Sequence, residues 1–188
     1  MPIIATGSET KTYAPAPEGV HQAVCADVID LGMMLSAFPD ERTGQPKQQH
    51  KINVVWQIEE KRDDGKRHQL YKRFTLSLHE KAALRHDLES WRGKAFTFDE
   101  LAGFDVEKLI GANCLINVQH RKSKDGTRTY ANVVAVMPLV KGMPKIGIHE
   151  YERWTPKSAT EGNPAEPPPH DDDPVSVPDY DDSDEPPF

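Results

Sequence analysis

The chain has 188 residues, of which 37% are hydrophobic and 16 are prolines, a composition that suits one compact core plus additional unstructured sequence. It has no run of about 18 apolar residues and no apolar N-terminal stretch typical of a secretory signal, so we expect a cytoplasmic protein without membrane attachment. The net charge of -7 is uneven. Residues 158–188 hold ten Asp and Glu and no Lys or Arg, which leaves 23 basic and 20 acidic side chains elsewhere. A mildly basic body with an acidic tail indicates a nucleic-acid surface joined to an interaction segment.

Signals for catalysis or metal binding are weak. Cys25 and Cys114 lie in apolar runs without a C-x-x-C partner, so we expect reduced core cysteines. The eight histidines lack zinc-binding spacing, and no G-x-x-x-x-G-K-[ST] phosphate loop occurs. We therefore predict no catalytic residue, no metal and no cofactor.

The first half of the chain predicts three strands. Residues 20–31, 51–58 and 67–76 are rich in β-branched and apolar residues and are separated by polar loops. Asp64-Gly65, between the second and third runs, is a strong hairpin signal.

The second half predicts a helix and another hairpin. From Leu78 to Trp91 the apolar residues recur at helical spacing, Ser77 with Glu80 has the pattern of a capping box, and Gly93 is a natural stop. We expect a short acidic helical piece at residues 98–111. A second hairpin follows, formed by residues 113–121 and 129–137 across Asp125-Gly126.

The predicted order is therefore β-β-β-α-β-β, which is the order of the five-stranded OB-fold barrel, with a generic α+β sheet as the alternative. The predicted organisation is an N-terminal arm at 1–18, an OB-fold domain at 19–140, a linker or barrel-packing extension at 141–157, and a disordered acidic tail at 158–188.

A groove for an unpaired strand needs aromatic rings for the bases and cations for the phosphates. Alternation along the third strand puts Gln69, Tyr71 and Arg73 on one face and the apolar residues Leu70, Phe74 and Leu76 on the other. We therefore predict that Tyr71 stacks on bases and that Arg73 neutralises phosphate.

Other candidates come from the second strand and the second hairpin. Lys51 is predicted to point outward, whereas Trp56 belongs either to the core or to the groove. Trp91 is expected to pack with the other apolar residues of the predicted helix. Trp154 could either pack on the barrel or extend the groove. The full predicted DNA-binding set is Lys51, Trp56, Tyr71, Arg73, Arg121, Lys122, Arg128 and Tyr130.

The acidic tail contains eight prolines and almost no large apolar residue before Phe188, which predicts disorder. A flexible coil of about 30 residues spans roughly 30 Å, so the tail can reach the body's own groove and compete weakly with DNA. Once displaced, Phe188 could enter an apolar pocket on a partner while a basic side chain pairs with the terminal carboxylate.

The ending Asp-Asp-Ser-Asp-Glu-Pro-Pro-Phe, together with the strand order, resembles the single-stranded DNA-binding proteins of bacteria and their phages, which join an OB-fold to an acidic tail ending in Pro-Phe. The resemblance implies recruitment of replication, recombination and repair proteins. It departs at Pro186, where the bacterial tip usually has an apolar residue. The tail residues that it assigns to partner binding are Asp181, Asp182, Asp184, Glu185, Pro187 and Phe188.

Residues 77–120 resemble a group of phage and prophage proteins of the single-strand-binding type, which implies a viral setting in the cytoplasm of a bacterial host. The resulting prediction is a non-enzymatic, sequence-independent protein that binds single-stranded DNA, with a possible homo-oligomer. Two alternatives stay open. Glu59-Glu60-Lys61 resembles the E-x-K element of metal-dependent nucleases, and the acidic tail could belong to a DNA-mimicking or adaptor protein.

Overall fold

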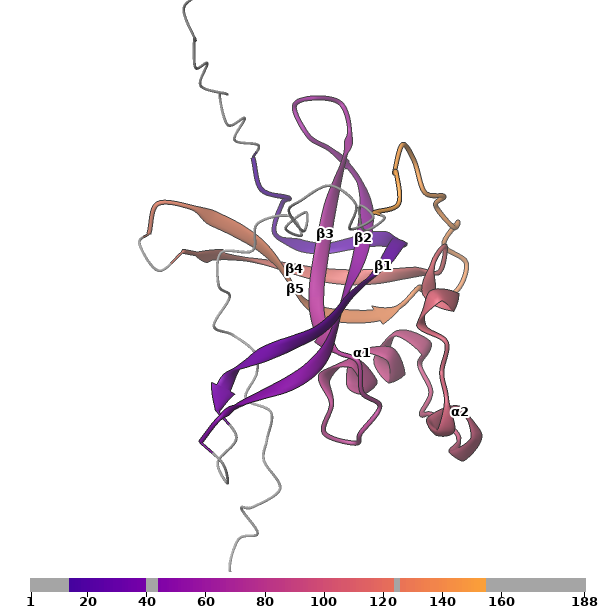
Figure 1. The fold of residues 1–188 in the computed structure, drawn as a ribbon. Coiled ribbons are helices and arrows are strands. Elements are labelled where there is room, and N and C mark those ends of the chain that lie inside the picture. Colours follow the sequence, from indigo (N-terminus) through magenta and orange to yellow (C-terminus); the bar gives the residue numbers. More distant parts are fainter. Residues whose placement is uncertain (1–13, 40–43, 124–125, 155–188) are drawn as a thin grey trace, which may run out of the picture.

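The computed structural model describes residues 14–39, 44–123 and 126–154 (Figure 1). Most of the predicted arm at 1–18 and the whole predicted tail at 158–188 lie outside these residues. The same holds for the tail's predicted partner-binding residues Asp181, Asp182, Asp184, Glu185, Pro187 and Phe188. No helix in the described part of the chain is long and apolar enough to cross a membrane.

Five antiparallel strands form one sheet, with the helices inserted between the third and fourth strands (Figure 1). This confirms the predicted mostly-β class and the order β-β-β-α-β-β. The elements are β1 (Gly19–Pro39), β2 (Pro46–Lys61), β3 (Arg67–Thr75), α1 (Ala83–Arg92), α2 (Phe98–Ala102), the 3₁₀-helix η1 (Val106–Leu109), β4 (Asn113–Lys122) and β5 (Thr129–Pro138).

The strand order in the sheet is β3-β2-β1-β4-β5, so β1 is central and pairs with both β2 and β4. The edge strands β3 and β5 approach each other to within 8 Å between Cα atoms. Among the described strands no hydrogen-bonded pairing joins them. The order is the one expected for an OB-fold, and closure into a barrel stays a prediction.

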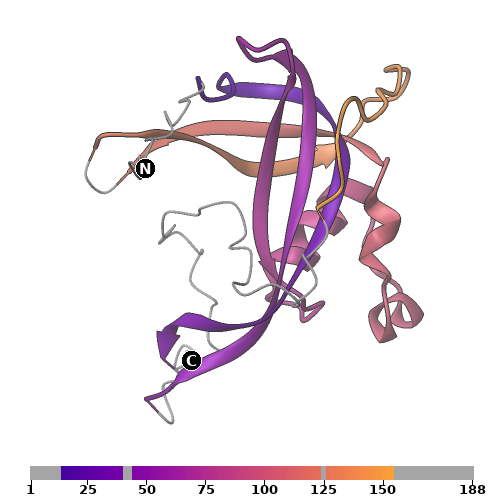
Figure 2. The ribbon, with the colours of Figure 1, turned by 45° about the horizontal axis from the view of Figure 1, so that its top comes forward.

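Strand β1 pairs with both β2 and β4, and irregularities in its pairing with β2 bend it. Register shifts with β2 occur between Cys25 and Asp27 and between Asp30 and Gly32, where Gly32 has a φ of 69°. Bulges of this kind bend a strand and increase its twist. Beyond them, residues 33–39 and 46–50 leave the body as a two-stranded extension, the β1–β2 ribbon (Figure 2).

The core lies between the sheet and α1. The ring of Trp56 on β2 is 6.0 Å from that of Trp91 on α1, with the planes tilted by 50°. Cys25 and Cys114 are buried free thiols, as expected. Burial raises the pKa of the Cys25 thiol to about 12, which leaves it unreactive at neutral pH.

The helix begins later than its periodicity predicts, and the predicted capping box is wrong. α1 starts at Ala83, and its N-cap Ala82 makes no side-chain capping bond. The Ser77 hydroxyl instead accepts a hydrogen bond from the backbone N–H of His79 within a turn. A capping box does occur at Thr97, whose hydroxyl accepts from the Glu100 backbone N–H.

Two other local predictions have opposite outcomes. Gly93 ends α1 as predicted, with a φ of 65° that glycine adopts without strain. Leu76, predicted to share the apolar face of the third strand with Leu70 and Phe74, lies just beyond the end of β3 and is 37% exposed. Strand alternation no longer fixes the direction of its side chain there.

Candidate nucleic-acid interface

The outer face of β2 and β3 is the side opposite Trp56, Leu70 and Phe74. Register fixes its members, because Val55 pairs with Tyr71 and Asn53 pairs with Arg73. The outer residues are Lys51, Asn53, Val55 and Gln57 on β2, and Gln69, Tyr71, Arg73 and Thr75 on β3. The predicted grouping of Gln69, Tyr71 and Arg73 on one face of β3 is confirmed.

The cations of the outer face are held against the sheet by short polar contacts. Lys51 Nζ donates to Thr75 Oγ1 at 2.7 Å, and Arg73 Nε donates to Asn53 Oδ1 at 3.3 Å. Asn53 is almost fully buried, whereas Lys51 and Arg73 are half-buried. The outer-face rows Val55–Tyr71, Asn53–Arg73 and Lys51–Thr75 follow one another along the strands. The two positive charges therefore lie one row and two rows away from the half-buried Tyr71, in the same direction along the sheet.

The remaining predicted cations lie on the β4–β5 hairpin. Arg121 pairs with Tyr130 and Lys122 pairs with Thr129, so the basic and aromatic groups are cross-strand neighbours. Arg121, Lys122 and Arg128 are exposed and Tyr130 is half-buried. In both ribbon views this hairpin and the β1–β2 ribbon project to the same side of the body (Figures 1 and 2). The predicted set is thus divided between the outer face and a projecting hairpin.

Trp56 does not belong to the interface. It is 1% exposed, and its register partners, Cys25 on β1 and Leu70 on β3, are core residues. Of the two interpretations left open for Trp56, packing is the one found in the structure, because its position along β2 has the parity of the inner face.

A strap formed by residues Pro144–Trp154 crosses the outer side of the sheet. Side chains of the strands bind its backbone. The Asn113 amide both accepts from the Ile146 N–H (2.8 Å) and donates to the Ile146 carbonyl (3.0 Å). Gln57 makes the same pair of bonds to His149, each at 2.9 Å. These bonds hold the strap against the sheet. Residues 155–157 of the predicted linker or barrel-packing extension lie outside the described residues.

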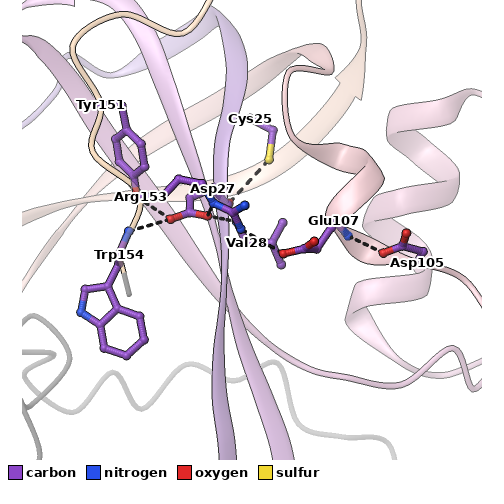
Figure 3. Close-up of polar contacts among 8 residues, drawn as sticks. All are labelled: Cys25, Asp27, Val28, Asp105, Glu107, Tyr151, Arg153 and Trp154. Atoms are coloured by element: carbon purple, nitrogen blue, oxygen red, sulfur yellow. Dashed lines mark hydrogen bonds and ion pairs between the residues drawn. The ribbon is translucent and has the colours of Figure 1, made fainter. Parts of the chain in front are cut away.

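The strap ends on Asp27, a fully buried carboxylate (Figure 3). Its Oδ1 accepts from the Val28 N–H and from Arg153 Nε, both at 2.9 Å. Its Oδ2 accepts from the Tyr151 hydroxyl at 3.1 Å and from the Trp154 N–H at 3.0 Å. A buried carboxylate is tolerated only with such compensation. Three of the four donors come from the strap, so Asp27 fixes its position.

The protonation state of Tyr151 and a second bond of Arg153 both support the contact between the strap and Asp27. Burial and the neighbouring Asp27 carboxylate raise the pKa of Tyr151, so its hydroxyl stays a donor. Arg153 also bonds Glu107 of η1 at 3.0 Å, which ties the strap to the helical segment. The sequence analysis did not identify Asp27 as a structural residue. The feature that could have indicated it is an acidic residue inside the apolar run AVCADVIDL.

The E-x-K segment is engaged in contacts within the sheet. Glu60 Oε1 lies 2.7 Å from His21 Nδ1, and Glu59 lies 3.8 Å from Arg67. In the described ranges, no group of three or more His, Cys, Asp or Glu residues is arranged to hold a metal ion.

No protein-family model matches the chain, and no curated protein is significantly similar to it.

Proposed function

We propose that this protein is a non-enzymatic, sequence-independent single-stranded DNA-binding protein that coats unpaired DNA during replication, recombination or repair. The observation that carries the proposal is the outer face of β2 and β3, where successive rows of the sheet present the ring of Tyr71 and then the cations Arg73 and Lys51. An aromatic ring with cations beside it matches the alternating bases and phosphates of an unpaired strand.

The kind of side chain supports binding without sequence preference. Stacking on Tyr71 uses the flat face that every base has, and each stacked base contributes about 1–3 kcal/mol. Lys51 and Arg73 would contact phosphates, which position a strand but carry no sequence information. Duplex DNA hides its base faces, so this surface favours unpaired strands.

The β4–β5 hairpin would extend the same interface. Arg121, Lys122 and Arg128 place positive charge near its tip, and the hairpin projects to the same side as the β1–β2 ribbon. Hairpin loops of OB-folds commonly contact oligonucleotides. We propose that this hairpin holds the strand by its phosphates while Tyr130 adds a stacking surface.

The acidic C-terminal segment would add regulation and recruitment. Its ten carboxylates would compete with DNA for the basic groups of the interface, and Phe188 would anchor replication or recombination proteins. Deleting residues 179–188 should tighten DNA binding and abolish recruitment. Weaker DNA binding after this deletion would contradict the competition.

The first experiment is an anisotropy titration of a fluorescein-labelled oligo-dT with the full chain at two salt concentrations, with a duplex of equal length as the control. We expect micromolar or tighter binding of oligo-dT at low salt, weaker binding at high salt because counterions are released, and much weaker binding of the duplex. Gel analysis of the same samples should show an intact oligonucleotide. No binding at low salt, or metal-dependent cleavage, would reject the proposal.

A further inference from the structure

The three tryptophans of the chain are Trp56, Trp91 and Trp154, and they occupy very different environments. Trp56 and Trp91 are 1% and 7% exposed, and the indole N–H of Trp91 donates to the Asn113 carbonyl at 3.0 Å. Trp154 lies on the strap and keeps part of its surface exposed. It is therefore the one indole of the chain that an external ligand could contact in this fold.

Strand register relates Trp154 to the proposed interface. Asp27 pairs with Val55 across β1 and β2, and Val55 pairs with Tyr71 across β2 and β3. The three residues form one row across the outer face. Neighbouring strands are about 4.8 Å apart, so Asp27 and Tyr71 stand roughly 10 Å from each other. The Trp154 N–H lies 3.0 Å from Asp27 Oδ2, which places the Trp154 backbone over the start of this row.

The main chain at Trp154 is held firmly. Tyr151, Arg153 and Trp154 all donate to the same carboxylate, and the Trp154 indole extends away from that carboxylate (Figure 3). A stacking residue on a fixed backbone loses less conformational entropy when a base binds to it.

We propose that Trp154 is a further base-stacking residue of the interface besides Tyr71 and Tyr130, positioned by Asp27, so that the strap and β3 both contact the bound strand. The proposal rests on the proposed function. Unpaired bases would stack on the partly exposed rings of Trp154 and Tyr71, which lie toward the two ends of the row that contains the buried Val55.

The test combines two measurements on the full chain with oligo-dT: intrinsic tryptophan fluorescence, and anisotropy of a labelled oligonucleotide. We expect oligo-dT to quench the fluorescence of the wild type. Trp154→Phe should still bind, because phenylalanine also stacks, but should lose most of the quenching. Trp154→Ala should weaken binding about 5- to 150-fold, the range expected for one lost base stack.

The matched control is Phe98→Ala, which removes an aromatic ring that is 88% exposed on α2. It should bind and quench like the wild type. Thermal unfolding of each variant separates loss of folding from loss of a contact.

The two possible failures can be told apart. Normal affinity of folded Trp154→Ala, or full quenching in Trp154→Phe, would overturn the role of Trp154 while leaving DNA binding intact. Absence of any anisotropy change with the wild type would overturn the proposed function and this inference together.

Discussion

The two faces of β2 and β3 share one backbone but are built for different tasks. On the inner face Trp56, Leu70 and Phe74 are at most 3% exposed and pack with α1. On the outer face the neighbouring positions hold Tyr71 and Arg73, both half-buried. Because successive side chains of a strand point to opposite faces, substitutions at neighbouring positions alter different faces of the sheet. Substitutions on the inner face should therefore lower stability, and substitutions on the outer face should lower DNA binding.

The largest effect is expected from the inner face. Trp56→Ala should lower the free energy of unfolding by about 3–5 kcal/mol, because it removes a fully buried ring from its contact with Trp91. Tyr71→Ala on the outer face is the matched control and should cost less than about 1 kcal/mol. Urea denaturation measures both. Equal costs for the two variants would contradict the division between the faces.

The second largest effect on the free energy of unfolding is expected when the contact between the strap and Asp27 is removed. Asp27→Ala removes the shared acceptor of Tyr151, Arg153 and Trp154, which should cost about 2 kcal/mol and expose the strap to proteolysis. The control on the same strand is Asp30→Ala, whose side chain is 67% exposed and which should cost well under about 1 kcal/mol. An Asp27→Ala protein with normal stability and an intact strap would show that this carboxylate does not fix the segment.

Substitutions on the outer face should affect DNA binding without large effects on stability. Arg73→Ala should weaken oligo-dT binding roughly 10-fold and reduce the salt slope by about 1, since one phosphate contact is lost. Tyr71→Ala should weaken binding by a similar factor with little change in the slope. Lys94→Ala, an exposed cation in the loop after α1, is the control for Arg73. Titrations at four salt concentrations give the slopes, and identical slopes for all variants would rule out the Arg73 contact with phosphate.

A smaller effect is expected from His68 on β3. Burial, and secondarily the charge of Arg62, lower its pKa below 6.5, so the folded state keeps the ring neutral. Below pH 6.5 the unfolded chain binds more protons than the folded chain, so stability should decrease as the pH falls from about 6.5 toward the lowered folded-state pKa. His68→Gln should show a weaker decrease between pH 7.5 and 5.5. A steeper decrease of stability in the variant would contradict a lowered pKa for His68 in the folded state.

Local patterns in the sequence predict much of this fold. β-branched runs and Asp-Gly turns locate all five strands, and alternation places Tyr71 and Arg73 together on one face. The pattern at Ser77 and Glu80 failed because a capping box is a short motif that also occurs outside helix starts. Helical periodicity is likewise only approximate at the ends of elements.

The parts that sequence reasoning missed depend on contacts between distant segments. Asp27 and Trp154 are 127 positions apart, and no local pattern indicates that one accepts a hydrogen bond from the other. The choice between core and groove for Trp56 likewise depended on the packing of α1 against the sheet. The signal that remained in the sequence was an acidic residue within an apolar strand, which needs a hydrogen-bond partner wherever it is buried.

The most direct test of the account is photocrosslinking of an oligo-dT that carries 5-iodouracil to the full chain, with mass spectrometry to locate the attached peptides. If the outer face is the nucleic-acid surface, crosslinks should fall on the β3 peptide with Tyr71, the strap peptide with Trp154 and the hairpin peptide with Tyr130. Crosslinks confined to the α1–η1 region, with exposed Phe98 as the main aromatic target, would contradict it.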